Sequence, residues 1–201
     1  MLTIHHAPGA RSLRVLWLCE EMGLAYETRA ASFMQPSDEF KALNPLRTIP
    51  TLQDGDVTMI ESVAMMLYII GKYGPTDLEV KPDDPAYADY LQYMLFAEAG
   101  LSVFCNPLIA TKSVAPEDQK SNWTADFLGK TIERRLKFID QRLAGKTYIA
   151  GDRFTAADIS LVYAGLITKF VGFADAAPKG FADYCARMME RPAYQRAASV
   201  K

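Results

Sequence analysis

The chain has 201 residues, of which 50% are hydrophobic and 23% are charged, a composition typical of a soluble globular protein with one large or two small domains. Its formal net charge of −2 at pH 7 excludes a broad basic surface for nucleic-acid phosphates, so we expect no nucleic-acid partner. The three cysteines are far apart and form no Cys-x-x-Cys pair, which argues against a dithiol oxidoreductase and favours a reducing, cytoplasmic environment.

Targeting and metal-binding signals are not found in the sequence. The first residues, MLTIHHAPGARSLRVLWL, do not combine the basic start, apolar core and cleavage site of a signal peptide. No apolar run approaches the roughly 18–20 residues that span a bilayer, so we expect no membrane segment. The two histidines, His5 and His6, are adjacent in an early strand, and we expect no metal site.

Residues 1–75 combine strand and helix patterns. The dipeptide Asp54-Gly55 lies between two short apolar runs and predicts a hairpin. The expected elements are, in order, a strand over 2–7, a helix over 12–23, a strand over 26–31, a short helix within 36–43, the two hairpin strands and a helix over 62–73. A strand-helix-strand unit implies a parallel pair with a right-handed crossover, so these residues predict a small α/β domain.

The chain changes character after this domain. Residues 76–85 form a polar, proline-rich connection typical of a linker, and residues 86–201 show helical patterns throughout. The expected helices cover 86–108, 116–143, 155–170 and 179–191, followed by a short tail. Thr155 and Asp158 have the spacing of a capping box at a helix start. The second domain is therefore expected to be an all-α helical bundle.

An α/β domain with this element order, followed by an all-helical domain, resembles the cytosolic glutathione S-transferases. The resemblance covers the whole chain and is strongest to bacterial and fungal members whose first helix starts Arg-Ser-x-Arg. It rests on the segments Leu13–Leu18, Thr48-Ile49-Pro50, Glu61-Ser62 and Gly151–Asp158. It implies a thioredoxin-like first domain, glutathione as co-substrate, no metal and a homodimer.

The resemblance also implies where glutathione binds. Pro50 is expected to follow a cis peptide bond, so that Thr48 and Ile49 present backbone groups to the cysteinyl part of glutathione, as in strand addition. Ser62 is expected to hold the γ-glutamyl carboxylate at a helix N-terminus, and Glu61 the ammonium group. From the residues alone, a trans proline at a strand start and a simple helix cap stay possible.

The group that stabilises the thiolate of glutathione is expected in the turn Pro8-Gly9-Ala10-Arg11-Ser12, where relatives carry tyrosine, serine or cysteine. Arg11 aligns with the cysteine of some bacterial members, and Ala10 with the serine of others. Ser12 is the remaining hydroxyl in the turn and is our catalytic candidate, the alternative being a helix cap. Arg11 is the second candidate, acting through its charge.

The resemblance places the electrophile beside the first long helix of the second domain. The candidate pocket residues are Tyr93, Phe96, Phe104, Asn106, Tyr163 and Phe170, although aromatic residues at such spacing also form ordinary helix cores. Glu98 stands out on this apolar helix, either as an interdomain contact or as a ligand of the glutathione ammonium group.

These expectations together describe a glutathione transferase that conjugates the thiolate to a small hydrophobic electrophile. Two alternatives stay open. One is a glutathione-dependent peroxidase that uses the same thiolate. The other is a protein of the same fold that binds glutathione or hydrophobic ligands without turnover.

Overall fold

The computed structural model describes residues 1–201, which form two compact units. The first unit comprises Met1–Glu79 together with Glu190–Lys201, and the second comprises Val80–Met189. The expected α/β domain followed by a helical domain is confirmed. The final segment differs from the expectation, because residues 190–201 join the first unit and not the helical one.

The first unit contains a four-stranded sheet with the strand order β2-β1-β3-β4. Its strands are β1 Leu2–His6, β2 Tyr26–Ala30, β3 Thr51–Asp54 and β4 Val57–Met59. β1 runs parallel to β2 and antiparallel to β3, and β3 runs antiparallel to β4. Because β1 lies inside the sheet with helices on its faces, four of its five residues are buried.

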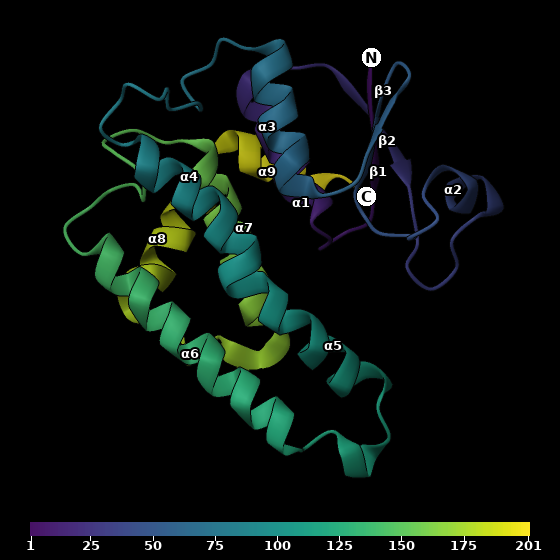
Figure 1. Ribbon diagram of the computed structural model, residues 1–201, viewed down its shortest axis with the longest axis vertical. Coiled ribbons are helices and arrows are strands. Elements are labelled where there is room, and N and C mark those ends of the chain that lie inside the picture. The colour runs from purple at the N-terminus through teal and green to yellow at the C-terminus, as the bar shows by residue number, and fades with distance from the viewer. The chain divides into compact units, whose positions relative to one another are not determined.

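Helices cover both faces of this sheet, with α1 and α3 on one side and α2 on the other (Figure 1). The helices of the first unit are α1 Ser12–Met22, α2 Asp38–Leu43, α3 Ser62–Tyr73 and α9 Pro192–Ser199. α1 contacts β1, α3 and α9, which explains why it is apolar around most of its circumference. It ends at Gly23, whose φ of 65° is the left-handed conformation of a helix C-cap.

The segment 190–201 attaches to α1 through side chains that are distant in sequence. Arg191 donates two hydrogen bonds to the carboxylate of Glu21, at 2.6 and 2.8 Å. Trp17 packs edge-on against Tyr194, with their ring centroids 5.0 Å apart. The segment therefore covers one side of α1 and completes the core of the first unit.

The second unit is helical throughout. Its α-helices are α4 Tyr87–Leu95, α5 Cys105–Val114, α6 Trp123–Leu143, α7 Ala156–Thr168 and α8 Lys179–Met189. The single helix expected over 86–108 is interrupted by a π-helical turn over Phe96–Leu101 and a 3₁₀ turn over Ser102–Phe104. The helix expected over 116–143 begins only at Trp123, after a short 3₁₀ turn over Glu117–Gln119.

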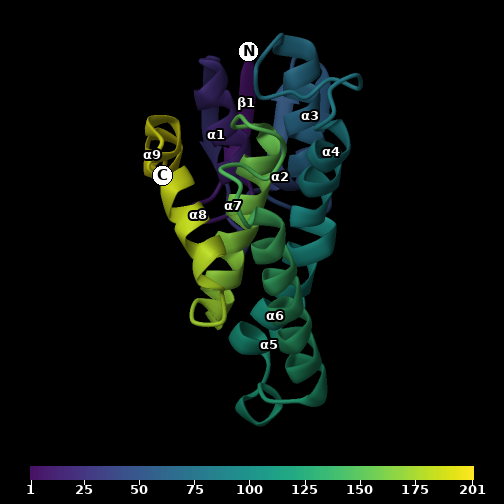
Figure 2. The same cartoon turned by 90° about the vertical axis from the view of Figure 1, so that its left-hand side faces the viewer.

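Helix α7 forms the centre of the second unit and packs against α4 and α8 (Figure 2). Asp158 in its first turn is fully buried. Its carboxylate accepts hydrogen bonds from the backbone N–H of Thr155 at 2.8 Å and of Ile149 at 2.9 Å, and from the hydroxyl of Tyr184 at 2.7 Å. The expected capping box is confirmed, and its carboxylate also ties α7 to α8 and to the preceding loop.

The expectation that no apolar run approaches the length of a membrane span is wrong for two helical stretches. Tyr87–Val114 and Ala156–Phe173 are long and apolar enough to cross a bilayer by length and composition. The stretch Ala156–Phe173 is 67% buried inside the protein. A core helix of a soluble protein is long, apolar and buried in the same way, so these two stretches are weak evidence for a membrane span.

Candidate active site

A tight turn between β1 and α1 forms the first part of the candidate site. The N–H of Ala10 donates to the carbonyl of Ala7 at 3.0 Å, and Gly9 adopts a φ of 76° that side-chain-bearing residues rarely tolerate. Ala7 and Ala10 are buried in a small apolar cluster with Phe40 and Ile49. This cluster holds the turn against the loop that precedes β3.

The loop before β3 supplies the second part of the site. The peptide bond between Ile49 and Pro50 is cis, which confirms the expectation from the sequence. The side chain of Ile49 is buried in the cluster just described, whereas Thr48 is exposed. Of the expected glutathione-binding residues, Thr48, Ile49 and Pro50 thus lie beside the β1–α1 turn.

Asn44 organises this loop, a role that the sequence did not reveal to us. Its buried amide nitrogen donates to the carbonyl of Thr48 at 3.0 Å and to the hydroxyl of Thr51 at 2.9 Å. Its side-chain oxygen accepts from the N–H of Leu46 at 3.0 Å. The signal in the sequence was the dipeptide Asn44-Pro45, because asparagine before proline favours the start of a turn.

The N-terminus of α3 supplies the third part of the site. Glu61 is the N-cap residue with a φ of 73°, its side chain is exposed, and it makes no side-chain cap. Ser62 is only 3% exposed, and the first bond of the helix runs from the N–H of Met65 to the carbonyl of Glu61 at 2.9 Å. N–H groups without a side-chain cap at a helix start give this end a partial positive charge suited to an anion.

A buried arginine links α1 to the start of α3. Arg14 is 0% exposed, and its Nε donates to the hydroxyl oxygen of Ser62 at 2.9 Å. The sequence pattern of the first helix includes Arg14, but it predicts no binding or catalytic role for this residue. A charged residue inside the apolar run Leu13–Leu18 was the available signal, because arginine is seldom fully buried without a specific partner.

The structure counts against the catalytic role expected for Ser12. This residue is 0% exposed, and its hydroxyl oxygen lies 2.8 Å from Nδ1 of His6. The other ring nitrogen of His6 lies 3.3 Å from the carbonyl oxygen of Val200, which is only an acceptor, so that nitrogen carries the proton. Burial lowers the pKa of His6 and favours this neutral ring.

The protonation of His6 decides the direction of its bond with Ser12. With the proton of the neutral ring on Nε2, Nδ1 is an acceptor, and the Ser12 hydroxyl must be the donor. A hydroxyl has one proton, so Ser12 has none to donate to the sulfur of glutathione while this bond is present. Ser12 thus joins β1 to α1 in the structure. Elimination by residue type considered which hydroxyl was available in the turn, and not whether that hydroxyl was buried.

Arg11 is the remaining candidate in this turn for the group that stabilises the thiolate, because Ser12 is buried and bonded to His6. It occupies the N-cap position of α1 with a φ of −58° and a ψ of −15°, and its side chain is partly exposed. No side-chain cap occupies this helix start. Arg11 and the positive end of α1 therefore belong to the turn in which the family resemblance leads us to expect the thiolate-stabilising residue.

Two of the expected electrophile contacts are core residues of the helical unit. Tyr93 and Tyr163 are 1% and 3% exposed, so the helical spacing that suggested them reflects packing. Phe96 is half-buried and packs on Phe138 at a centroid distance of 5.6 Å. The ring of Phe104 lies under the guanidinium of Arg135. Among the candidates, the exposed side chains are those of Asn106 and of Phe170, which is 76% exposed.

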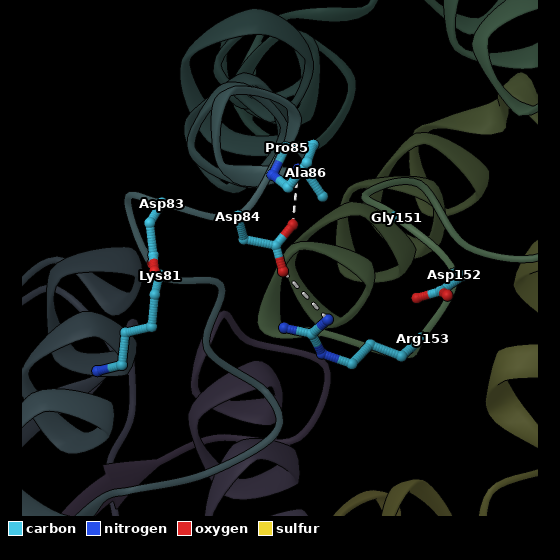
Figure 3. A pocket seen from close by; sticks show the side chains of 8 residues that line it. All are labelled: Lys81, Asp83, Asp84, Pro85, Ala86, Gly151, Asp152 and Arg153. Carbon is cyan, nitrogen blue, oxygen red and sulfur yellow. Dashed lines mark hydrogen bonds and ion pairs between the residues drawn. The ribbon is translucent and has the colours of Figure 1, made fainter.

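A surface pocket of about 750 Å³ lies elsewhere in the helical unit, between the segment before α4 and the loop before α7. Figure 3 shows the Asp84 carboxylate between the N–H of Ala86, at 2.8 Å, and the guanidinium of Arg153, at 3.4 Å. None of the expected substrate residues lines this pocket. The Asp84–Arg153 ion pair instead ties the start of the unit to the Gly151–Asp158 segment.

The cysteines do not supply a nucleophile. Cys19, Cys105 and Cys185 are buried free thiols. Burial raises the pKa of Cys19 and of Cys185 to about 12, which keeps both in the unreactive thiol form.

The fold and site together define a class of protein. A thioredoxin-like unit brings a cis-proline loop, a helix N-terminus and the turn of the first helix together, and a helical unit follows it. Residues 10–70 match the family model of the glutathione S-transferase N-terminal domain, and residues 93–192 match that of the C-terminal domain. The chain belongs to the glutathione S-transferase family.

Individual relatives agree with this membership. The chain is 30% identical to glutathione S-transferase 1 of Schizosaccharomyces pombe over 164 residues, covering 78% of the chain and 71% of that relative. The crystal structure of the glutathione transferase URE2P6 from Phanerochaete chrysosporium, in complex with oxidized glutathione, is similar with a TM-score of 0.84 and 26% identity, over 98% of this chain and 94% of that one.

The same fold also occurs in a protein named for another role. The nitrogen regulation fragment of the yeast prion protein Ure2p matches with a TM-score of 0.86 at 20% identity, covering 100% of this chain and 96% of that one. This likeness shows the fold alone.

Proposed function

We propose that the protein is a glutathione transferase that joins the sulfur of glutathione to a small hydrophobic electrophile. The observation that carries the proposal is the start of α3, where a buried serine backed by an arginine stands at a helix N-terminus without a side-chain cap. Such an end attracts a carboxylate. Membership of the glutathione S-transferase family, together with the complex of a structural relative with oxidized glutathione, supports this identity of the ligand.

The residues of the first unit take distinct roles in this proposal. The backbone of Ile49 pairs with the cysteinyl part of glutathione in the manner of an added strand, next to Thr48 and Pro50. Ser62 and the first-turn N–H groups of α3 hold the γ-glutamyl carboxylate, and Glu61 receives the ammonium group. The sulfur of glutathione then lies near the start of α1.

The chemical step is the attack of a thiolate. The glutathione thiol loses its proton to water, and the sulfur forms a bond to an electrophilic carbon. With an aryl halide the halide leaves with its bonding electrons, and with an enone the electrons of the double bond move to the carbonyl oxygen and the enolate takes up a proton from water. A free thiol has a pKa near 8.5, and lowering it by two units requires about 2.7 kcal/mol of preferential stabilisation of the thiolate. We assign this stabilisation to the charge of Arg11 and the N-terminus of α1.

The test combines binding with turnover. Calorimetric titration of the full chain with glutathione is expected to show binding, and an activated aryl halide or an enone is expected to be consumed together with the thiol. Absence of glutathione binding would refute the proposal.

We further propose that the protein is cytoplasmic and forms a homodimer. Sedimentation tests the dimer, because a species of 22.4 kDa at micromolar concentration would contradict it.

One observation favours a second candidate, a protein of this fold that binds glutathione or a hydrophobic ligand without turnover. Ala10 replaces the serine of some relatives, and the Ser12 hydroxyl is bonded to His6. The thiolate would then lack the hydroxyl donor that other members use. Binding of glutathione with no rate against any electrophile or hydroperoxide supports this candidate, and a rate with hydroperoxides alone supports the peroxidase.

A further inference from the structure

We propose that Arg14 is a positioning residue of the carboxylate subsite, in which its buried guanidinium orients the Ser62 hydroxyl toward the γ-glutamyl carboxylate of glutathione. The inference rests on the proposed function, because it concerns how that ligand is recognised. It adds a residue from α1 to a subsite that the sequence assigned to the start of α3 alone. Three features of the Arg14–Ser62 pair support it.

The first feature is the direction of the hydrogen bond. A guanidinium has donors and no acceptor, so in the 2.9 Å contact Nε of Arg14 is the donor and Oγ of Ser62 the acceptor. The hydroxyl proton of Ser62 takes no part in that bond. It is therefore available to an acceptor outside the protein, such as a carboxylate oxygen.

The second feature is the rigidity of the pair. Arg14 is 0% exposed and Ser62 is 3% exposed, and both are held on regular helices, α1 and α3. The packed side chain of Arg14 cannot swing into solvent as a surface arginine does. The hydroxyl of Ser62 is thus oriented before the ligand arrives, which lowers the entropy cost of binding.

The third feature is charge. Arg14 places a permanent cation one hydrogen bond away from the hydroxyl oxygen of Ser62, and the uncapped N-terminus of α3 adds its partial positive charge. A buried cation acts through a lower effective dielectric than an exposed one, so its effect on a nearby carboxylate is stronger. The neutral parts of glutathione gain nothing from this charge.

The experiment therefore compares two ligands that differ only in the carboxylate. One is glutathione, and the other is 4-aminobutanoyl-cysteinyl-glycine, which keeps the amine, the thiol and the glycine but lacks the γ-glutamyl carboxylate. Both are titrated calorimetrically into the full-length wild type and Arg14→Met. We expect the variant to lose glutathione affinity by about tenfold or more, and to bind the analogue within about twofold of the wild type.

Two further variants control for folding and for net charge. Arg29→Met removes an exposed arginine of the same unit that pairs with Glu39, and it is expected to leave both affinities unchanged. Arg14→Lys keeps the charge but loses the planar fork, and is expected to restore part of the preference for glutathione. If Arg14→Met does not fold, the ligand comparison is made with Arg14→Lys and Ser62→Ala, each of which should bind glutathione more weakly and the analogue as the wild type does.

The outcomes separate this inference from the proposed function. An equal loss of affinity for both ligands in folded Arg14 variants overturns the positioning role while glutathione binding by the wild type still stands. A wild type that binds neither ligand overturns both. Loss confined to glutathione supports the role, since a merely structural arginine would not distinguish the two ligands.

Discussion

The hydroxyl of Ser12 donates to Nδ1 of His6 across 2.8 Å, and both side chains are buried. His6 in turn meets the carbonyl oxygen of Val200 at 3.3 Å. The start of α1 is therefore connected through β1 to the last part of the first unit. We infer from this relationship a structural role for Ser12, with consequences that differ from those of a catalytic serine.

Ser12→Ala is expected to lower stability and leave the chemistry of the bound thiol unchanged. The substitution leaves Nδ1 of His6 buried without a donor, which costs about 1–3 kcal/mol. Urea denaturation measures this loss, and the thiolate absorbance of the glutathione complex, titrated with pH, measures the pKa of the thiol. An alkaline shift of that titration would restore the catalytic role for Ser12.

Arg11→Ala is expected to raise the pKa of the bound glutathione thiol. The cation favours the thiolate, so its removal makes ionisation harder and turnover at neutral pH slower, while turnover at alkaline pH recovers. The same absorbance titration measures the shift. Arg11→Lys keeps the charge and should retain most of the effect, and an unshifted titration in Arg11→Ala would exclude the role.

Asp158→Ala is expected to destabilise the helical unit severely. The carboxylate caps α7 and accepts from Thr155, Ile149 and Tyr184, so its loss removes a cap and leaves buried donors unpaired, for a total of at least about 2 kcal/mol. Thermal unfolding measures the loss. The exposed Asp126 in the first turn of α6 is the control, and its change to alanine should stay within about 0.5 kcal/mol. Native melting with lost glutathione binding would show that Asp158 belongs to the site.

Asp54 is expected to contribute stability that disappears in acid. Lys72, with Tyr73 and Tyr68, donates to its carboxylate and lowers the pKa of Asp54 to about 2. The unfolded value is about 3.9, so the contribution is complete above about pH 4 and is lost as the pH falls through about 2. Urea unfolding at several pH values should show Asp54→Asn losing less stability than the wild type over this window. Parallel losses would contradict the assignment.

The pair formed by Glu21 and Arg191 is expected to show a measurable coupling energy. The Glu21 side chain is 10% exposed and also accepts from the indole of Trp17 at 2.9 Å, so solvent screens this pair weakly. A double-mutant cycle of Glu21→Gln and Arg191→Met should give a coupling within about 0.5–3 kcal/mol. The exposed pair Lys179–Asp183 on α8 is the control, expected at about 0.3–0.5 kcal/mol. Equal couplings in the two cycles would show that burial does not strengthen the first pair.

The fold could be predicted from the sequence because its signals are local. The hairpin at Asp54-Gly55 and the capping box of Thr155 and Asp158 each depend on neighbouring residues, and both are present in the structure. The break in the helix after α4 was missed, because its π-helical turn has no proline at the interruption and keeps an apolar pattern.

The candidate site was only partly predictable, for a physical reason. Residue type suggested Ser12 as a donor, but whether a hydroxyl is available depends on its partner, and His6 becomes that partner only in the folded sheet. The contact of Arg14 with Ser62 joins residues 48 positions apart, and that of Arg191 with Glu21 joins residues 170 apart. No periodicity in the sequence reports such pairs.

The division of the first unit into two stretches of chain has a consequence for its synthesis. Residues 1–79 leave the ribosome early, but Trp17 and Glu21 on α1 contact Tyr194 and Arg191, which lie in the segment 190–201. Domains usually fold in the order of their synthesis. Here the whole helical unit must be translated before the first unit can close, so the unit that begins first is completed last. We expect a nascent chain stalled at Met189 to expose the side of α1 that carries Trp17.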